Sequence, residues 1–152
     1  MRLSRKGRFA ITAMMNLALN SKKGPMTLTQ LTYDQGISLS YLEQIFAKLR
    51  AEGLVEGVRG PGGGYCLARP LEDISVADIV MAIDGKEAAR NPESLATLYH
   101  SERSPVHDMW AELSNDLYDF MGQISLADCV KKYAKLKSDI SEKSASKEIA
   151  MV

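Results

Sequence analysis

The sequence predicts a mostly α-helical fold with one small β-hairpin. In several segments apolar residues recur at a helical spacing, and a glycine-rich turn separates two short runs that are typical of strands. The chain has 152 residues, of which 45% are hydrophobic and 25% charged. This composition supplies enough apolar material for the core of one globular domain with appendages.

Six helices are predicted from the apolar spacing. They cover residues 5–19, 28–35, 39–52, 76–83, 106–121 and 126–133. All but the fifth follow a Ser or Thr, whose side chain can accept a hydrogen bond from a free backbone N–H at the helix start. These N-cap residues are Ser4, Thr27, Ser38, Ser75 and Ser125. Gly36 lies between the second and third helices and suits the left-handed conformation that ends many helices.

The β-hairpin is predicted between the third and fourth helices. Strand-like runs at 54–58 and 65–68 flank the sequence RGPGGG at 59–64, which only a turn accommodates. The hairpin therefore follows two helices that are joined by a short glycine-containing turn. This order of elements is that of a winged helix-turn-helix, which we assign to residues 1–83.

The second half of the chain divides into three further segments. Residues 84–105 lack periodicity and are expected to form a long loop. Residues 106–137 hold a long amphipathic helix and a short terminal helix, and the apolar stripe of the long helix is expected to join two copies of the chain. The predicted dimer contacts are Val106, Met109, Trp110, Leu113, Leu117 and Phe120. Residues 138–152, rich in Ser, Lys and Glu, are expected to be a disordered tail.

The charge distribution points to a polyanionic partner. Residues 1–70 carry ten Lys or Arg and four Asp or Glu, a net charge of +6, whereas residues 71–152 carry nine and fifteen, a net charge of −6. A basic half of this kind is typical of nucleic-acid binding.

Other function classes find little support in the sequence. Two histidines and two cysteines occur without the spacing of a metal site, and no GxSxG motif frames a nucleophile, so an enzyme is not expected. No apolar run is long enough for a membrane span, and the first residues do not form a signal peptide. With only two cysteines, a reducing cytoplasmic location is expected.

Residues 39–52 are the predicted recognition helix, which would enter the major groove of double-stranded DNA. On its polar side Gln44 could pair with adenine and Glu43 could accept a hydrogen bond from cytosine. Arg59, at the tip of the hairpin, could enter a narrow minor groove. Basic residues at the start of the first helix oppose the helix dipole, which suggests that an anion such as phosphate compensates them. The candidate DNA contacts are Arg2, Ser4, Lys6, Arg8, Ser38, Ser40, Tyr41, Glu43, Gln44, Arg50, Arg59, Gly60 and Gly64.

Three segments give the chain a specific resemblance. MRLSRKGRFA at 1–10, GISLSYLEQIF at 36–46 and VRGPGGGY at 58–65 resemble the iron–sulfur cluster regulator (IscR-like) family of winged helix-turn-helix transcription regulators. The resemblance covers about residues 1–130. It implies a bacterial, dimeric regulator that binds a pseudo-palindromic operator. By the same resemblance Ser40, Glu43 and Gln44 face bases, Ser38 and Tyr41 face the DNA backbone, and Arg59 lies in the minor groove.

One departure from that family concerns its [2Fe–2S] cluster, which three cysteines and a histidine hold. The positions that match the cysteines are Pro92, Leu98 and Ser104, and only His107 matches a ligand. A cluster requires thiolate ligands, so no cofactor is expected. Three alternatives stay open. Another ligand or a partner protein could act at the 84–105 loop, oxidation of Cys66 could control binding, or the chain could be an interaction module that has lost DNA binding.

Overall fold

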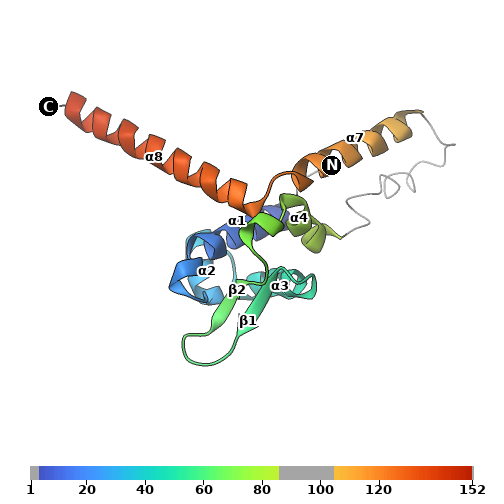
Figure 1. Cartoon of the computed structure of the whole chain (residues 1–152), viewed down its shortest axis with the longest axis horizontal. Helices are drawn as coiled ribbons and strands as arrows, with labels where there is room; N and C mark the ends of the chain where they lie inside the picture. The colour runs from blue at the N-terminus through green and yellow to red at the C-terminus, as the bar shows by residue number, and fades with distance from the viewer. Residues whose placement is uncertain (1–3, 86–104, 152) are drawn as a thin grey trace.

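A computed structural model gives the fold of residues 4–85 and 105–151, which are the residues described below (Figure 1). The elements are α1 Arg5–Leu19, η1 Ser21–Lys23, α2 Leu28–Gln35, α3 Leu39–Ala51, β1 Val55–Val58, β2 Gly64–Leu67, η2 Leu71–Asp73, α4 Val76–Asp84, α7 Pro105–Gly122 and α8 Leu126–Ala150. The predicted fold class, mostly helical with one hairpin, is confirmed. The two short 3-10 helices were not predicted.

The predicted helix caps form as expected. The side chains of Ser4, Thr27, Ser38, Ser75 and Ser125 each accept a hydrogen bond from a backbone N–H in the first turn of their helix. Gly36 ends α2 in the left-handed conformation, at φ 62° and ψ 27°. The local chemistry of the caps therefore sets where these helices begin, to within one residue of the sequence prediction.

The two strands form an antiparallel hairpin in which Val55 pairs with Leu67 and Val58 with Gly64. A third segment joins it, because Met26 and Tyr65 exchange backbone hydrogen bonds of 2.9 Å and 2.7 Å. Met26 directly precedes Thr27, the cap of α2. The wing is thus fastened to the start of the helix-turn-helix and does not stand free.

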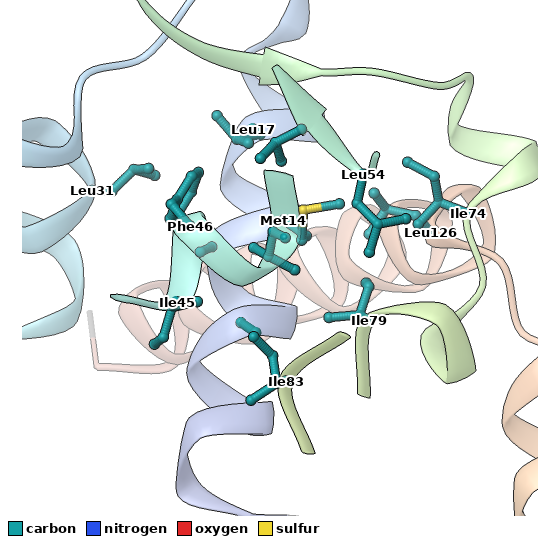
Figure 2. Packing of buried hydrophobic residues seen from close by; sticks show 14 of the residues in the cluster. Met14, Leu17, Leu31, Ile45, Phe46, Leu54, Ile74, Ile79, Ile83 and Leu126 are labelled. Atoms are coloured by element: carbon teal, nitrogen blue, oxygen red, sulfur yellow. The ribbon is translucent and has the colours of Figure 1, made fainter. Parts of the chain in front are cut away.

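The core lies around α1 and is built from α1, α2, α3, α4, the hairpin and the first turn of α8 (Figure 2). Phe46, Met14 and Leu126 are among its fully buried side chains. The ring of Phe46 meets that of Tyr65 edge-on, with centroids 4.9 Å apart, and so connects α3 to the wing. The expected domain boundary at residue 83 needs correction, because Leu126 completes this core from 43 residues further along the chain.

The starts of α4 and α8 are joined to each other. The Val76 N–H donates to the Ile124 carbonyl at 2.9 Å, and the Leu126 N–H donates to the Ile74 carbonyl at 2.7 Å. Each helix also has its own capping box, Ser75 with Asp78 and Ser125 with Asp128. We call this antiparallel contact between the two caps the cap junction.

The C-terminal helix corrects a second expectation. The sequence predicts that this helix ends near residue 133 and that residues 138–152 form a disordered tail, whereas α8 is helical to Ala150. The same Lys, Glu and Ala residues that make the segment polar are good helix formers, and neither Gly nor Pro occurs after Gly122 to break the helix. Polar composition alone was therefore a poor guide to disorder here.

Helices α7 and α8 leave the domain on the side away from the hairpin and diverge from each other (Figure 1). The six residues predicted as dimer contacts all lie on α7 and are 44–60% exposed. Of the expected loop at 84–105, residues 86–104 lie outside the described part of the chain. Within the described residues, no helix combines the length and apolar character that a membrane crossing needs.

Candidate nucleic-acid interface

Helix α3 has one buried and one exposed face. Its buried face carries Leu42, Ile45, Phe46 and Leu49. The opposite face is exposed and carries Ser40, Glu43 and Gln44 near its start and Arg50 two turns after Glu43. Because the apolar face is fixed in the core, these polar side chains are held outward on a rigid helix, as groove readout requires.

The turn between α2 and α3 fixes the start of the recognition helix. Gly36 reverses the chain, and the side chain of Ser38 then accepts a hydrogen bond from the Tyr41 N–H at 3.3 Å. Ser38 itself is exposed. The positive end of the α3 dipole therefore faces solvent, in a position to meet a phosphate.

Tyr41 links this helix start to α1. Its half-buried ring lies edge-on to Phe9, with centroids 5.9 Å apart and an interplanar angle of 87°. The Lys6 Nζ lies 5.9 Å from the Tyr41 ring centroid, at the limit of a cation–π contact. Two predicted contacts from segments far apart in the sequence, Lys6 and Tyr41, are thus neighbours, and the exposed Arg8 lies on the same helix as Lys6.

Ser4 has a different surrounding from the one expected. Its hydroxyl accepts a hydrogen bond from the Gly7 N–H at 2.9 Å and donates one to the Asp84 carboxylate at 2.6 Å. Asp84, at the end of α4, therefore places a negative charge at the start of α1. The anion that the basic helix start seemed to require is supplied inside the chain, so the dipole argument for a phosphate at this point loses its force. Arg2 lies outside the described residues.

The wing ends in a tight turn. The Gly63 N–H donates to the Gly60 carbonyl at 2.9 Å, and Gly62 has a φ of 72°, the arrangement of a type II turn with Pro61 at its second position. Arg59 is exposed directly before this turn. The guanidinium is therefore carried at the tip of a short, well-defined hairpin.

A close approach between two backbone segments explains why residue 64 is a glycine. A Cβ at this position would clash with the Met26 carbonyl oxygen, and the φ of Gly64 is 150°. Glycine is needed because the wing backbone approaches the segment before α2 closely. The structure shows this packing role for Gly64, and its place among the DNA contacts stays a prediction, as does that of Gly60, which lies exposed in the turn.

Sequence reasoning missed two basic residues that hold the interface in place. The Lys48 Nζ donates to the Ile83 carbonyl at 3.0 Å and so connects α3 to the end of α4. The Arg69 guanidinium donates to the Glu52 and Gly53 carbonyls at 3.1 Å and 3.2 Å, at the end of α3. All three carbonyl groups lie at helix ends, where cations are favoured. No local pattern pairs residues that are 16 to 35 positions apart.

The surroundings of Cys66 bear on whether its oxidation could control DNA binding. Burial, with a smaller effect of the adjacent Glu56 carboxylate, raises the pKa of the Cys66 thiol. Because the thiolate is the reactive form, this environment disfavours oxidation of Cys66. Among the described residues no three His, Cys, Asp or Glu side chains gather as a metal site. Positions 92, 98 and 104, which the family resemblance matches to the cluster cysteines, lie outside those residues, and the Pro and Leu at the first two have no donor atom for iron.

The chain therefore has the architecture of a winged helix-turn-helix regulator of the DNA-binding class. Its recognition helix faces outward after a tight turn, and the hairpin is fastened beside it. Comparison with known families agrees. The Rrf2 family, described as iron-dependent transcriptional regulators, matches residues 3–132, and the chain belongs to this family.

Relatives and solved structures give the same assignment. The HTH-type transcriptional regulator IscR of Xenorhabdus nematophila is 43% identical over 146 residues, which cover 96% of this chain and 88% of the relative. The IscR structure of T. potens is 34% identical, with a TM-score of 0.72 and 88% of each chain covered. The structure of CymR, the global cysteine regulator of B. subtilis, is 27% identical with a TM-score of 0.74, covering 87% of this chain and 98% of that one. These relatives are transcription regulators, so the chain is not an enzyme.

Proposed function

We propose that this regulator binds a pseudo-palindromic operator as a homodimer and finds it without an iron–sulfur cluster. The observation that carries the proposal is the division of α3 into a fully buried apolar face and an exposed face that presents Ser40, Glu43 and Gln44. A helix anchored in this way can offer hydrogen-bonding groups to base edges without losing packing.

Base readout falls to the first turns of α3. Glu43 can accept from a cytosine amino group, and Gln44 can pair with adenine. Leu39, 45% exposed at the start of the helix, supplies an apolar contact for a thymine methyl group. Arg59 enters the minor groove beside the site, where a narrow groove concentrates negative potential.

Affinity comes from phosphate contacts around this readout. Lys6 and Arg8 on α1, Arg50 on α3 and the N-terminal end of α3 at Ser38 are the groups placed for them. The hydroxyl of Tyr41 reaches the DNA backbone from beside Lys6. These contacts position the protein and make its binding depend on salt.

The dimer rests on the exposed apolar stripe of α7. Two copies related by a twofold axis present two recognition helices to two half-sites. The cluster-free mode rests on Pro92, Leu98 and Ser104, which leave His107 as the single residue of the family's ligand set.

The test uses purified protein whose iron content has been measured, mixed with fragmented genomic DNA, and the bound fragments are sequenced. We expect a pseudo-palindrome to be enriched by an iron-free sample. The Glu43→Ala variant should relax the choice of one base pair in each half-site, whereas Glu72→Ala, an exposed glutamate on η2, should recover the same motif as the unchanged protein. Enrichment only after reconstitution with iron and sulfide would overturn the cluster-free mode, and no enrichment in either state would overturn the DNA-binding role.

A further inference from the structure

Helix α8 projects beyond the domain without support from its own chain. Its first turn is buried at Leu126, but every residue from Lys131 to Ala150 is exposed. At 1.5 Å per residue, this part of the helix extends about 30 Å from the core. Most of the stability of helices in proteins comes from packing of an apolar face, so a partner for this segment is expected.

The projecting part of α8 has an apolar stripe. Tyr133, Leu136 and Ile140 follow each other at spacings of three and four residues, which places them on one face, and they are 42%, 52% and 65% exposed. On the same helix Leu126 and Val130 occupy this face where it meets the core. The stripe is therefore a continuation of the buried face beyond the edge of the domain.

The charges beside the two exposed stripes are opposite in sign. Residues 105–122, which form α7, contain four acidic residues and neither Lys nor Arg. Glu112, Asp116 and Asp119 lie at spacings of four and three residues along one flank of the α7 stripe. In α8, residues 131–137 contain four lysines and no acidic residue, and Lys132 and Lys137 adjoin the stripe at Tyr133.

Within one chain these two helices cannot meet along their lengths, because they diverge from the turn between Gly122 and Leu126 (Figure 1). We propose that the α8 segment 131–140 of one copy packs along the acidic, apolar face of α7 of a second copy. A twofold axis repeats this pairing, so the dimer contains it twice. Charges beside an apolar seam set partner choice and orientation in helix pairs. The proposal rests on the homodimer proposed above and assigns α8 to its interface.

The test is a charge exchange in the full chain, with the dimer dissociation constant measured by sedimentation. We expect Lys132→Glu with Lys137→Glu to weaken the dimer by about tenfold or more, because each lost attraction occurs twice and becomes a repulsion. Adding Glu112→Lys with Asp116→Lys in α7 should restore most of the affinity. The matched control, Lys131→Glu with Lys135→Glu, makes the same charge change on the opposite face of α8 and should leave the dimer unchanged.

The outcomes separate this proposal from the dimer itself. An unchanged dimer after the Lys132 and Lys137 exchange overturns the α8 contact. Weakening that the α7 exchange does not restore overturns the pairing of α8 with α7, since α8 then meets some other surface. If the unchanged protein is monomeric at all concentrations, the homodimer fails, and binding of the monomer to a single half-site would still report the DNA-binding function.

Discussion

The domain formed by residues 4–85 and the first turn of α8 buries its apolar side chains, whereas α7 and the rest of α8 leave many of theirs exposed. In the domain, large side chains such as Phe46, Met14 and Leu42 are fully buried by their own chain. On α7, by contrast, Trp110 and Phe120 remain 52% and 60% exposed. The first region is complete as a monomer, whereas the second presents a surface that a partner has to cover.

One sequence pattern therefore serves two purposes in this chain. Apolar residues at a spacing of three and four predict a helix in both regions, but the pattern does not say which surface the helix will meet. Substitutions that affect folding and substitutions that affect association should therefore separate between the two regions.

The largest expected effect is on folding of the domain. Phe46→Ala removes a fully buried ring that contacts Tyr65 and should lower the free energy of unfolding by about 3–5 kcal/mol. Urea unfolding followed by circular dichroism, at concentrations where the chain is monomeric, measures this change. Leu113→Ala on α7 is the control and should cost much less there. An equal cost would mean that the two regions are not different in kind.

The next effect concerns association. Trp110→Ala combined with Leu113→Ala should raise the dimer dissociation constant by about 100-fold, because large side chains at the centre of an interface dominate its energy. Sedimentation equilibrium measures the constant. Tyr33→Ala, which removes a 92% exposed aromatic side chain from α2, serves as the control and should leave it unchanged. A dimer that ignores the loss of Trp110 and Leu113 would place its interface elsewhere.

A smaller effect distinguishes two basic residues of α3. Arg50 is exposed, whereas the Lys48 Nζ already donates to the Ile83 carbonyl. Arg50→Met should reduce the dependence of log K on log salt concentration by about one unit per half-site, as loss of one phosphate contact does. Lys48→Met should leave the slope unchanged, because its role is to position α3. Equal slopes for the two variants would remove this distinction.

The smallest expected effect compares one substitution in the two regions. Ser38→Ala removes the cap of α3 and should cost about 1 kcal/mol of stability in thermal or urea unfolding. Ser146→Ala, on the exposed end of α8, should change stability by less than about 0.5 kcal/mol. A larger effect at Ser146 would show that the end of α8 is held more firmly than its exposure implies.

Local signals were sufficient for most of the domain. Five Ser or Thr caps predict the starts of five helices and one left-handed glycine predicts the end of α2, because these interactions join residues no more than four positions apart. The exposed face of α3 was predicted in the same way, since the periodicity that identifies the buried Leu42 and Ile45 also identifies the polar residues opposite.

Contacts between distant segments could not be predicted in this way. Ser4 and Asp84 are 80 residues apart, and the need for glycine at Gly64 arises from Met26, far away in sequence. The length of α8 was missed for another reason. Its composition is compatible both with disorder and with an exposed helix, and only the spacing of Tyr133, Leu136 and Ile140 could have separated the two.

The cap junction between Ser75 and Ser125 has a consequence for the operators that this regulator can use. Two backbone hydrogen bonds hold α4 and α8 together there, and the Tyr118 hydroxyl donates to the Ala77 carbonyl at 3.1 Å beside them. The arm that we propose joins two copies is thus set at a fixed angle to the recognition helix. A dimer held together through this arm would present its two recognition helices at one fixed separation. That arrangement suits half-sites about 34–36 Å apart or a multiple of that distance. Inserting a few base pairs between the half-sites turns one of them away from its helix, so we expect such operators to bind the dimer more weakly.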